Sequence, residues 1–134
     1  MKKTYTGSCH CKKVRFEADI DLEAGTGKCN CSICGKKRAW ETMVKPDAFR
    51  LLAGDDALSD YQFGDKKCHH VFCKHCGIHP YAHGNIPEVG GEFISVSLSA
   101  LDDVEPAELV AASVKFYNGS EDDWTNQPAE IRHL

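Results

Sequence analysis

The chain has 134 residues, the usual size of one domain and too few for two separate hydrophobic cores. Its 16 basic and 20 acidic residues give a formal charge of −4, which argues against nucleic-acid phosphate as the main partner. No apolar run approaches the roughly 20 residues of a membrane span, and the residues before the first cysteines do not resemble a targeting signal. The sequence therefore predicts a single domain, residues 1–134, in the cytoplasm and without a membrane or nucleic-acid partner.

Alternating apolar and polar residues over 14–20 predict a strand with one buried face. Residues 21–28, which include Gly25 and Gly27, predict a loop that leads into Cys29. Turn signals separate the other predicted strands, which cover residues 40–44, 49–52, 60–63, 70–72, 92–99 and 114–116. Only residues 34–38 and 106–112 look helical. We therefore expect a mainly β domain with little helix.

The eight cysteines carry most of the chemical information in this sequence. They form four groups, which are Cys9 with Cys11, Cys29 with Cys31 and Cys34, Cys68 alone, and Cys73 with Cys76. In a reducing cytoplasm, tight cysteine clusters favour metal or redox chemistry over a disulfide framework. The spacing leaves both chemistries open, with metal binding favoured.

A Cys-x-x-Cys-Gly segment can form a turn that directs two thiolates toward one ion, as Cys73-Lys74-His75-Cys76-Gly77 does on this reading. Tetrahedral zinc needs a second pair of ligands, and Cys9 with Cys11 is the available pair. The alternative, a thioredoxin-like redox pair at Cys73 and Cys76, lacks the surrounding βαβ pattern. We therefore predict one zinc site closed by four cysteines, which would join the start of the chain to its middle and stabilise the fold.

The segment Cys29-Asn30-Cys31-Ser32-Ile33-Cys34 predicts a second, tighter cluster. Its three sulfurs can reach one ion only if the backbone turns sharply between Cys31 and Cys34, as a short helical turn would allow. Three protein ligands with water or substrate in the fourth position form a reactive zinc site, whereas a fourth protein ligand makes the site structural.

The fourth position of this second site stays open at the level of sequence. The residues that could close it are Cys68, His69, His70 and His75. The alternative for Cys68 is a buried small apolar residue, which is common for free cysteine. An iron–sulfur cluster fits less well than two zinc ions, because it normally takes four cysteine ligands. His79 is expected to orient a ligand by a hydrogen bond or to pack in the core.

These motifs, in this order, resemble the glutathione-dependent formaldehyde-activating enzyme (GFA) family, which includes centromere protein V. The resemblance covers residues 5–124 and rests on three segments, Gly7-Ser8-Cys9-His10-Cys11, Cys29-Asn30-Cys31-Ser32-Ile33-Cys34 and Phe72-Cys73-Lys74-His75-Cys76-Gly77-Ile78-His79. The aromatic, Gly-containing segment 116–124 is similar to the tail of many members. Lys12 stands where glycine is common after the first Cys-x-Cys.

The resemblance implies a single domain of coiled antiparallel β-sheets and two zinc ions. By this resemblance Cys9, Cys11, Cys73 and Cys76 hold a structural zinc, and Cys29, Cys31 and Cys34 hold a catalytic zinc. The implied activity is that of a carbon–sulfur lyase resembling S-(hydroxymethyl)glutathione synthase, whose partners are a small thiol such as glutathione and an aldehyde, formaldehyde. The alternative is a non-catalytic zinc-binding or protein-interaction module of the same fold.

Overall fold

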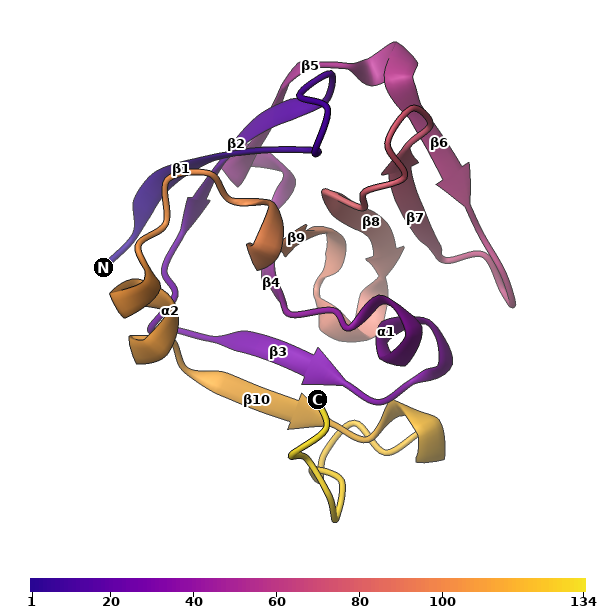
Figure 1. Cartoon of the computed structure of the whole chain (residues 1–134). Helices are drawn as coiled ribbons and strands as arrows, with labels where there is room; N and C mark the ends of the chain where they lie inside the picture. The colour runs from indigo at the N-terminus through magenta and orange to yellow at the C-terminus, as the bar shows by residue number, and fades with distance from the viewer.

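The computed structural model describes residues 1–134 and is mainly β, as predicted (Figure 1). Its strands are Lys3–Ser8 (β1), Arg15–Ile20 (β2), Thr26–Cys29 (β3), Glu41–Val44 (β4), Phe49–Ala53 (β5), Leu58–Tyr61 (β6), Cys68–Cys73 (β7), Tyr81–Ile86 (β8), Gly91–Ser97 (β9) and Val114–Tyr117 (β10). The α-helices are Ser32–Lys37 (α1) and Pro106–Ala111 (α2). Neither helix has the length and apolar composition that crossing a membrane requires.

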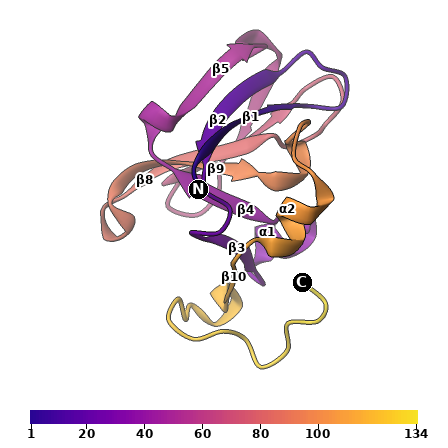
Figure 2. The same cartoon turned by 90° about the vertical axis from the view of Figure 1, so that its left-hand side faces the viewer.

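The strands form two sheets of unequal size. One has three strands in the order β1-β2-β5, and the other has seven in the order β10-β3-β4-β9-β8-β7-β6. All neighbouring strands are antiparallel except β10 and β3, which run parallel at one edge of the larger sheet. Figure 2 shows the three-stranded sheet lying over the middle of the larger one, with the C-terminal segment at the opposite end of the molecule.

The main core lies between the two sheets. On β2, Phe16, Ala18 and Ile20 point inward, because alternate residues of a strand face the same side. From the larger sheet Val96 is fully buried against them, and the ring of Phe16 stacks on Phe49 with centroids 5.3 Å apart. Each large side chain buried in this way contributes about 1.5–3 kcal/mol to folding. The opposite face of the larger sheet is therefore left for polar and cysteine chemistry.

The strands predicted over 14–20, 40–44, 49–52, 70–72 and 114–116 are confirmed with shifts of one or two residues at their ends. The two predicted helical segments are also present. The strand predicted over 60–63 occupies 58–61 instead, and the one predicted over 92–99 ends at Ser97 because Leu98–Ala100 turn as a 3-10 helix. Hydrophobic alternation therefore located the buried strands, but not their ends.

The loop predicted over residues 21–28 is wrong in its second half, since Thr26–Cys29 form β3. This strand exists because it pairs with β10, more than eighty residues later in the chain, from Val114↔Thr26 to Tyr117↔Cys29. Strands β1 and β8 were not predicted. The polar sequence of β8, Tyr81–Ile86, lacks a strong strand signal and is held by β7 and β9 on its two sides.

A charged network crosses the outer face of the three-stranded sheet. Arg50 on β5 donates to Glu17 at 2.6 Å and to both carboxylate oxygens of Asp19 at 2.8 and 3.1 Å. The hydrogen bonds from Arg50 and from the Thr4 hydroxyl lower the pKa of Asp19 to about 2. Asp19 therefore contributes stability at neutral pH that is lost as the pH falls from its ordinary pKa of 3.8 through about 2.

Replacing Arg50 by methionine is expected to lower the melting temperature at pH 7, with the difference from wild type shrinking as the pH approaches 2. The reason is that the protonated Asp19 no longer benefits from Arg50. Circular-dichroism melts of both zinc-loaded proteins, from pH 7 down to the lowest pH at which wild type still unfolds cooperatively, measure this. Arg15→Met, at an exposed position on β2 that has no ion pair, is the control. A difference between Arg50→Met and wild type that stays constant with pH would contradict the role given to Asp19.

Candidate metal centre and thiol cluster

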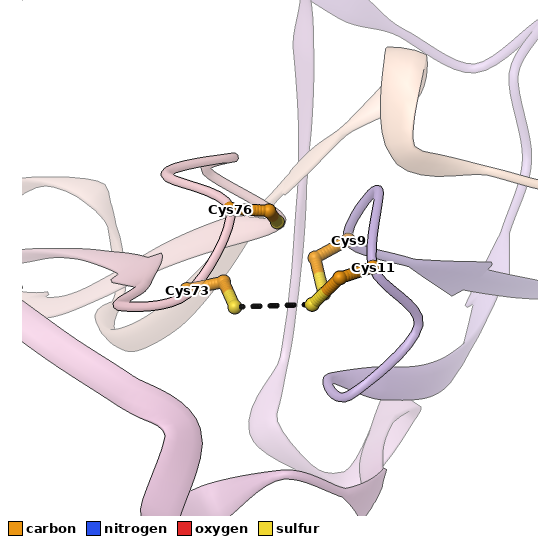
Figure 3. Close-up of side chains that lie close together, drawn as sticks. All are labelled: Cys9, Cys11, Cys73 and Cys76. Carbon is orange, nitrogen blue, oxygen red and sulfur yellow. Dashed lines mark hydrogen bonds between the residues drawn. The ribbon is translucent and has the colours of Figure 1, made fainter.

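Four cysteines from two distant parts of the chain meet at one point (Figure 3). Cys9 and Cys11 lie in the loop after β1, whereas Cys73 ends β7 and Cys76 lies in the turn that follows. Their sulfurs all lie within 4.8 Å of one another, with 3.6 Å between Cys9 and Cys11 and 3.7 Å between Cys11 and Cys73. Sulfurs around tetrahedral zinc, at Zn–S distances of about 2.3 Å, are ~3.8 Å apart. The four cysteines could therefore bind one metal ion, and their geometry is consistent with zinc.

Two left-handed residues shape the loops that carry these cysteines. Gly77 has φ +78°, and its N–H donates to the Cys73 carbonyl at 2.7 Å, which closes the turn around Cys76. Lys12 has φ +69° and donates its N–H to the Cys9 carbonyl at 3.1 Å. A glycine would adopt this conformation without strain. Lysine lacks this freedom, but its side chain makes a contact that glycine cannot make, because the ammonium of Lys12 donates to Ser8 Oγ at 3.0 Å.

Backbone N–H groups favour the thiolate form that metal binding requires. The N–H of Val14 donates to Cys9 Sγ at 3.3 Å. Backbone hydrogen bonds from Ile78 and Cys11 lower the pKa of Cys76 to about 6. Cys9 and Cys73 are buried together with Val14 in a small apolar cluster of their own, so this centre also forms a second packing core.

The segment that carries Cys29, Cys31 and Cys34 lies at the junction of β3 and α1. Cys29 ends the strand, Cys31 is the N-cap of the helix, and Cys34 lies within the first helical turn, so the sharp turn predicted here is present. Hydrogen bonds from the thiols of Cys29 and Cys34, with backbone N–H groups at the helix start, lower the pKa of Cys31 to about 2. Hydrogen bonds to Cys29 and Cys31 raise the pKa of Cys34. Within the cluster, Cys31 is therefore the sulfur most favoured as a thiolate.

A segment close to the C-terminus holds this cluster in place. Asn30 donates from Nδ2 to Asn118 Oδ1 at 2.8 Å and accepts from the Ser120 N–H at 2.9 Å. Between these partners, a Cβ on Gly119 would lie 2.7 Å from Cys29 Sγ. Sequence reasoning did not identify Asn30 or Gly119 as site residues. The available signal was the 116–124 segment, which the family resemblance singled out without assigning it a contact.

The residues considered as a fourth ligand lie in different surroundings. Cys68 begins β7, is half-buried and forms no hydrogen bond with the three cysteines. His69 pairs with Asp60 at 2.6 Å, and His75 is exposed. His79 is half-buried with its ring centroid 5.4 Å from that of Phe72. An open fourth position at the second site therefore stays a prediction from the sequence.

Polar side chains gather on the face of the larger sheet that points away from the main core. Strand register puts His70, Ser95 and Glu41 on this face, because directly paired residues of antiparallel strands share a face. Lys37 of α1 lies 3.6 Å from Glu41 Oε2. Burial raises the pKa of Glu41 and lowers the pKa values of His70 and His79. The positive charge of Lys37 lowers all three pKa values, so it opposes the effect of burial on Glu41 and adds to it on the two histidines.

Three buried polar atoms of this region have no hydrogen-bond partner in the protein. They are Glu41 Oε2, His70 Nδ1 and His79 Nδ1. The charge of Cys31 acts on both Glu41 and His70, so these groups belong to the surroundings of the thiol cluster. Glu41 Oε2 still has the ion-pair contact with Lys37, but the two histidine nitrogens have no partner, which is costly for buried atoms and suits a place where a polar ligand or water is bound.

An open pocket of about 110 Å³ adjoins the thiol cluster. Cys29 and Cys34 both line it, together with residues at the end of α1 and at the C-terminus. Two of the three cysteines therefore face a space that a small molecule can enter.

The chain is similar to known proteins in sequence and in fold. The model of the GFA family, described as glutathione-dependent formaldehyde-activating enzyme, matches residues 4–120. The chain is also similar to a Rhodobacter sphaeroides protein of known crystal structure, with 28% sequence identity and a TM-score of 0.69. The similarity covers 82% of this chain and 99% of the other, so it extends over nearly the whole fold.

Proposed function

Because the chain belongs to the glutathione-dependent formaldehyde-activating enzyme family, we propose that it is a zinc-dependent carbon–sulfur lyase acting on a small thiol adduct. Its substrates would be a thiol such as glutathione and an aldehyde such as formaldehyde. The proposal includes two zinc ions, a structural one at Cys9, Cys11, Cys73 and Cys76 and a catalytic one at the second cluster. The need for reduced thiols at both sites supports a cytoplasmic location.

The observation that carries this proposal is the position of the three-cysteine cluster. Cys29, Cys31 and Cys34 are half-buried, and two of them line the pocket. A zinc ion held there would bind the substrate thiol as a thiolate, which is the nucleophilic form. The four-cysteine centre differs because two of its cysteines, Cys9 and Cys73, are fully buried and pack with apolar residues, which suits a structural role.

The reaction forms one carbon–sulfur bond. The sulfur of the thiolate attacks the aldehyde carbon, the π electrons of the carbonyl move to oxygen, and the proton lost by the thiol is returned to that oxygen to give a hydroxymethyl thioether. The groups of this chain suited to hold that proton are Glu41 and His70, which are close enough to Cys31 to be affected by its charge, and Lys37, which pairs with Glu41. The reverse reaction removes the same proton and breaks the same bond.

The test uses NMR exchange spectroscopy to measure how fast glutathione and formaldehyde interconvert with their adduct. The rate with the zinc-loaded protein is compared with the rate in buffer. Calorimetry of glutathione binding accompanies it. We expect acceleration over buffer and binding of about one thiol per chain. A protein that binds zinc and the thiol without accelerating exchange would be a non-catalytic module, and one that does neither would contradict the proposal.

Cys34→Ser is expected to lose most of the rate acceleration and about one zinc per chain while keeping a cooperative thermal transition. The reason is that Cys34 belongs to the cluster beside the pocket and not to the four-cysteine centre. Metal analysis, the exchange assay and a melt of each protein measure this. Cys68→Ser is the matched control and should keep both zinc ions and the activity. Equal loss of activity in the two variants would show that Cys68 closes the second site.

A further inference from the structure

Two histidines lie directly opposite each other on neighbouring strands of the larger sheet, away from both cysteine clusters. The antiparallel register of β7 and β8 pairs His69 with His83. Their rings stack with centroids 4.6 Å apart and planes inclined by 11°. Successive residues of a strand point to opposite sides, so this pair lies on the other face of the sheet from His70. Two imidazoles are therefore presented side by side, one from each strand.

Asp60, on the edge strand β6, fixes the orientation and the tautomer of His69. Its Oδ2 lies 2.6 Å from His69 Nδ1. An ionised carboxylate can only accept hydrogen bonds, so Nδ1 carries the proton, and Nε2 is the nitrogen left to bind a metal ion. Histidine ligands of metal ions usually donate their other ring nitrogen to a carboxylate or a carbonyl in this way. The Asp60–His69 pair therefore has the form of a metal ligand with its supporting group.

Both histidines keep a ring nitrogen that the protein itself does not use. His69 Nε2 has only a long contact of 3.5 Å with the Gln62 side-chain amide, and the side chain of His69 is 36% exposed. The half-buried ring of His83 forms no hydrogen bond and lies beside the rings of His69 and Tyr81. Burial lowers the pKa of His83, so its imidazole is neutral at pH 7. Neutral imidazole is the form that binds a metal ion.

We infer that His69 and His83 form a binding site for a divalent transition-metal ion, with Asp60 as the positioning residue of His69. The site is separate from the four-cysteine centre, because His69 lies four residues before Cys73 on β7, which is roughly 13 Å along a strand. Nitrogens around a tetrahedral zinc ion are about 3.3 Å apart, so a rotation of the two stacked rings brings both to one ion. Imidazole ligands select Zn²⁺, Ni²⁺ or Cu²⁺ over Mg²⁺ and Ca²⁺, which prefer oxygen. Water completes the coordination, and the bound ion ties β7 to β8.

The experiment adds Ni²⁺ to the untagged, zinc-loaded protein and follows binding by calorimetry and by NMR of the histidine ring protons. We expect about one Ni²⁺ per chain with no release of zinc, and a higher melting temperature, because the ion binds only the folded state. Paramagnetic Ni²⁺ should broaden the ring resonances of His69 and His83 selectively, and Mg²⁺ should not bind. His69→Gln and His83→Gln should each abolish the binding. Asp60→Asn should lower the affinity about tenfold, the usual effect of removing a group that orients a ligand.

Asp65→Asn is the matched control, since Asp65 is an exposed carboxylate between β6 and β7 that pairs with Lys67 and not with a histidine. It should bind Ni²⁺ as wild type does. Broadening of other histidines instead of this pair, or release of zinc in proportion to the Ni²⁺ bound, would overturn the site. These two readouts use the wild type alone, so they decide the matter even if a variant fails to fold. Unchanged affinity in both histidine variants would also overturn the site, and equal losses in Asp60→Asn and Asp65→Asn would overturn the role of Asp60. The proposed function does not depend on any of these outcomes.

Discussion

Cys73→Ser is expected to abolish the stable folded state. Cys73 is fully buried, its sulfur lies 3.7 Å from that of Cys11, and it joins the loop after β1 to the end of β7. A structural zinc contributes on the order of 10 kcal/mol in small domains, which is comparable with the whole net stability of a domain of this size. Removing one ligand should therefore cost most of the stability, together with one zinc per chain.

Circular dichroism and metal analysis of the purified variant measure this result. We expect the loss of the cooperative thermal transition seen in the wild type. Cys68→Ser removes a half-buried thiol from the first residue of the same strand, outside the four-cysteine centre, and should melt close to wild type. If Cys73→Ser melted like Cys68→Ser, the four-cysteine centre would not be a structural site.

Gly119→Ala should disable the three-cysteine cluster while leaving the rest of the fold in place. The added Cβ would lie 2.7 Å from Cys29 Sγ, 2.8 Å from Cys31 Cβ and 2.9 Å from the ring of Trp124. Contacts this short force the neighbours to move, at a cost of about 1–3 kcal/mol for overpacking. The two cysteines belong to the cluster, so their displacement should lower the second zinc occupancy and the affinity for thiols.

Zinc stoichiometry and calorimetry with glutathione measure the effect of Gly119→Ala. Gly35→Ala is the matched control, because it adds the same methyl group next to the same cluster. Its Cβ meets only the Asn30 carbonyl oxygen at 3.9 Å, and alanine favours the helix by up to about 1 kcal/mol. Gly35→Ala should therefore keep two zinc ions and melt at the same or a slightly higher temperature. Two zinc ions and unchanged thiol affinity in Gly119→Ala would contradict the support given by this segment.

Sequence reasoning worked best where a residue's neighbours lie close to it in the chain. The alternation in β2 predicted its buried face, because a strand's geometry alone puts Phe16, Ala18 and Ile20 on one side. The spacing of Cys73 and Cys76 similarly predicted a tight turn, and Gly77 supplies its left-handed residue. Even the pairing with Cys9 and Cys11 was predictable, because tetrahedral zinc requires two more ligands and few cysteines were available.

The failures concern contacts between distant segments. Residues 26–29 have a weak strand signal of their own and become β3 through pairing with β10. The hydrogen bonds of Asn30 with Asn118 and Ser120 join residues about ninety positions apart, and no local sequence pattern predicts them. The pocket beside the cluster depends on the same kind of contact, since His133 and Leu134 line it together with residues about a hundred positions earlier, such as Cys29 and Cys34.

By itself the sequence determined which thiol ligands this protein offers to a metal ion and how they are spaced along the chain. The number, spacing and type of its cysteines predict two thiolate clusters, because a metal ion selects its ligands by donor atom and by the turns that present them. The tertiary structure decided which face each cluster occupies. Cys9 and Cys73 became buried at a junction between two loops, whereas Cys29 and Cys34 came to line an open pocket that the last two residues of the chain help to form, since burial is set by segments that lie far apart in the sequence.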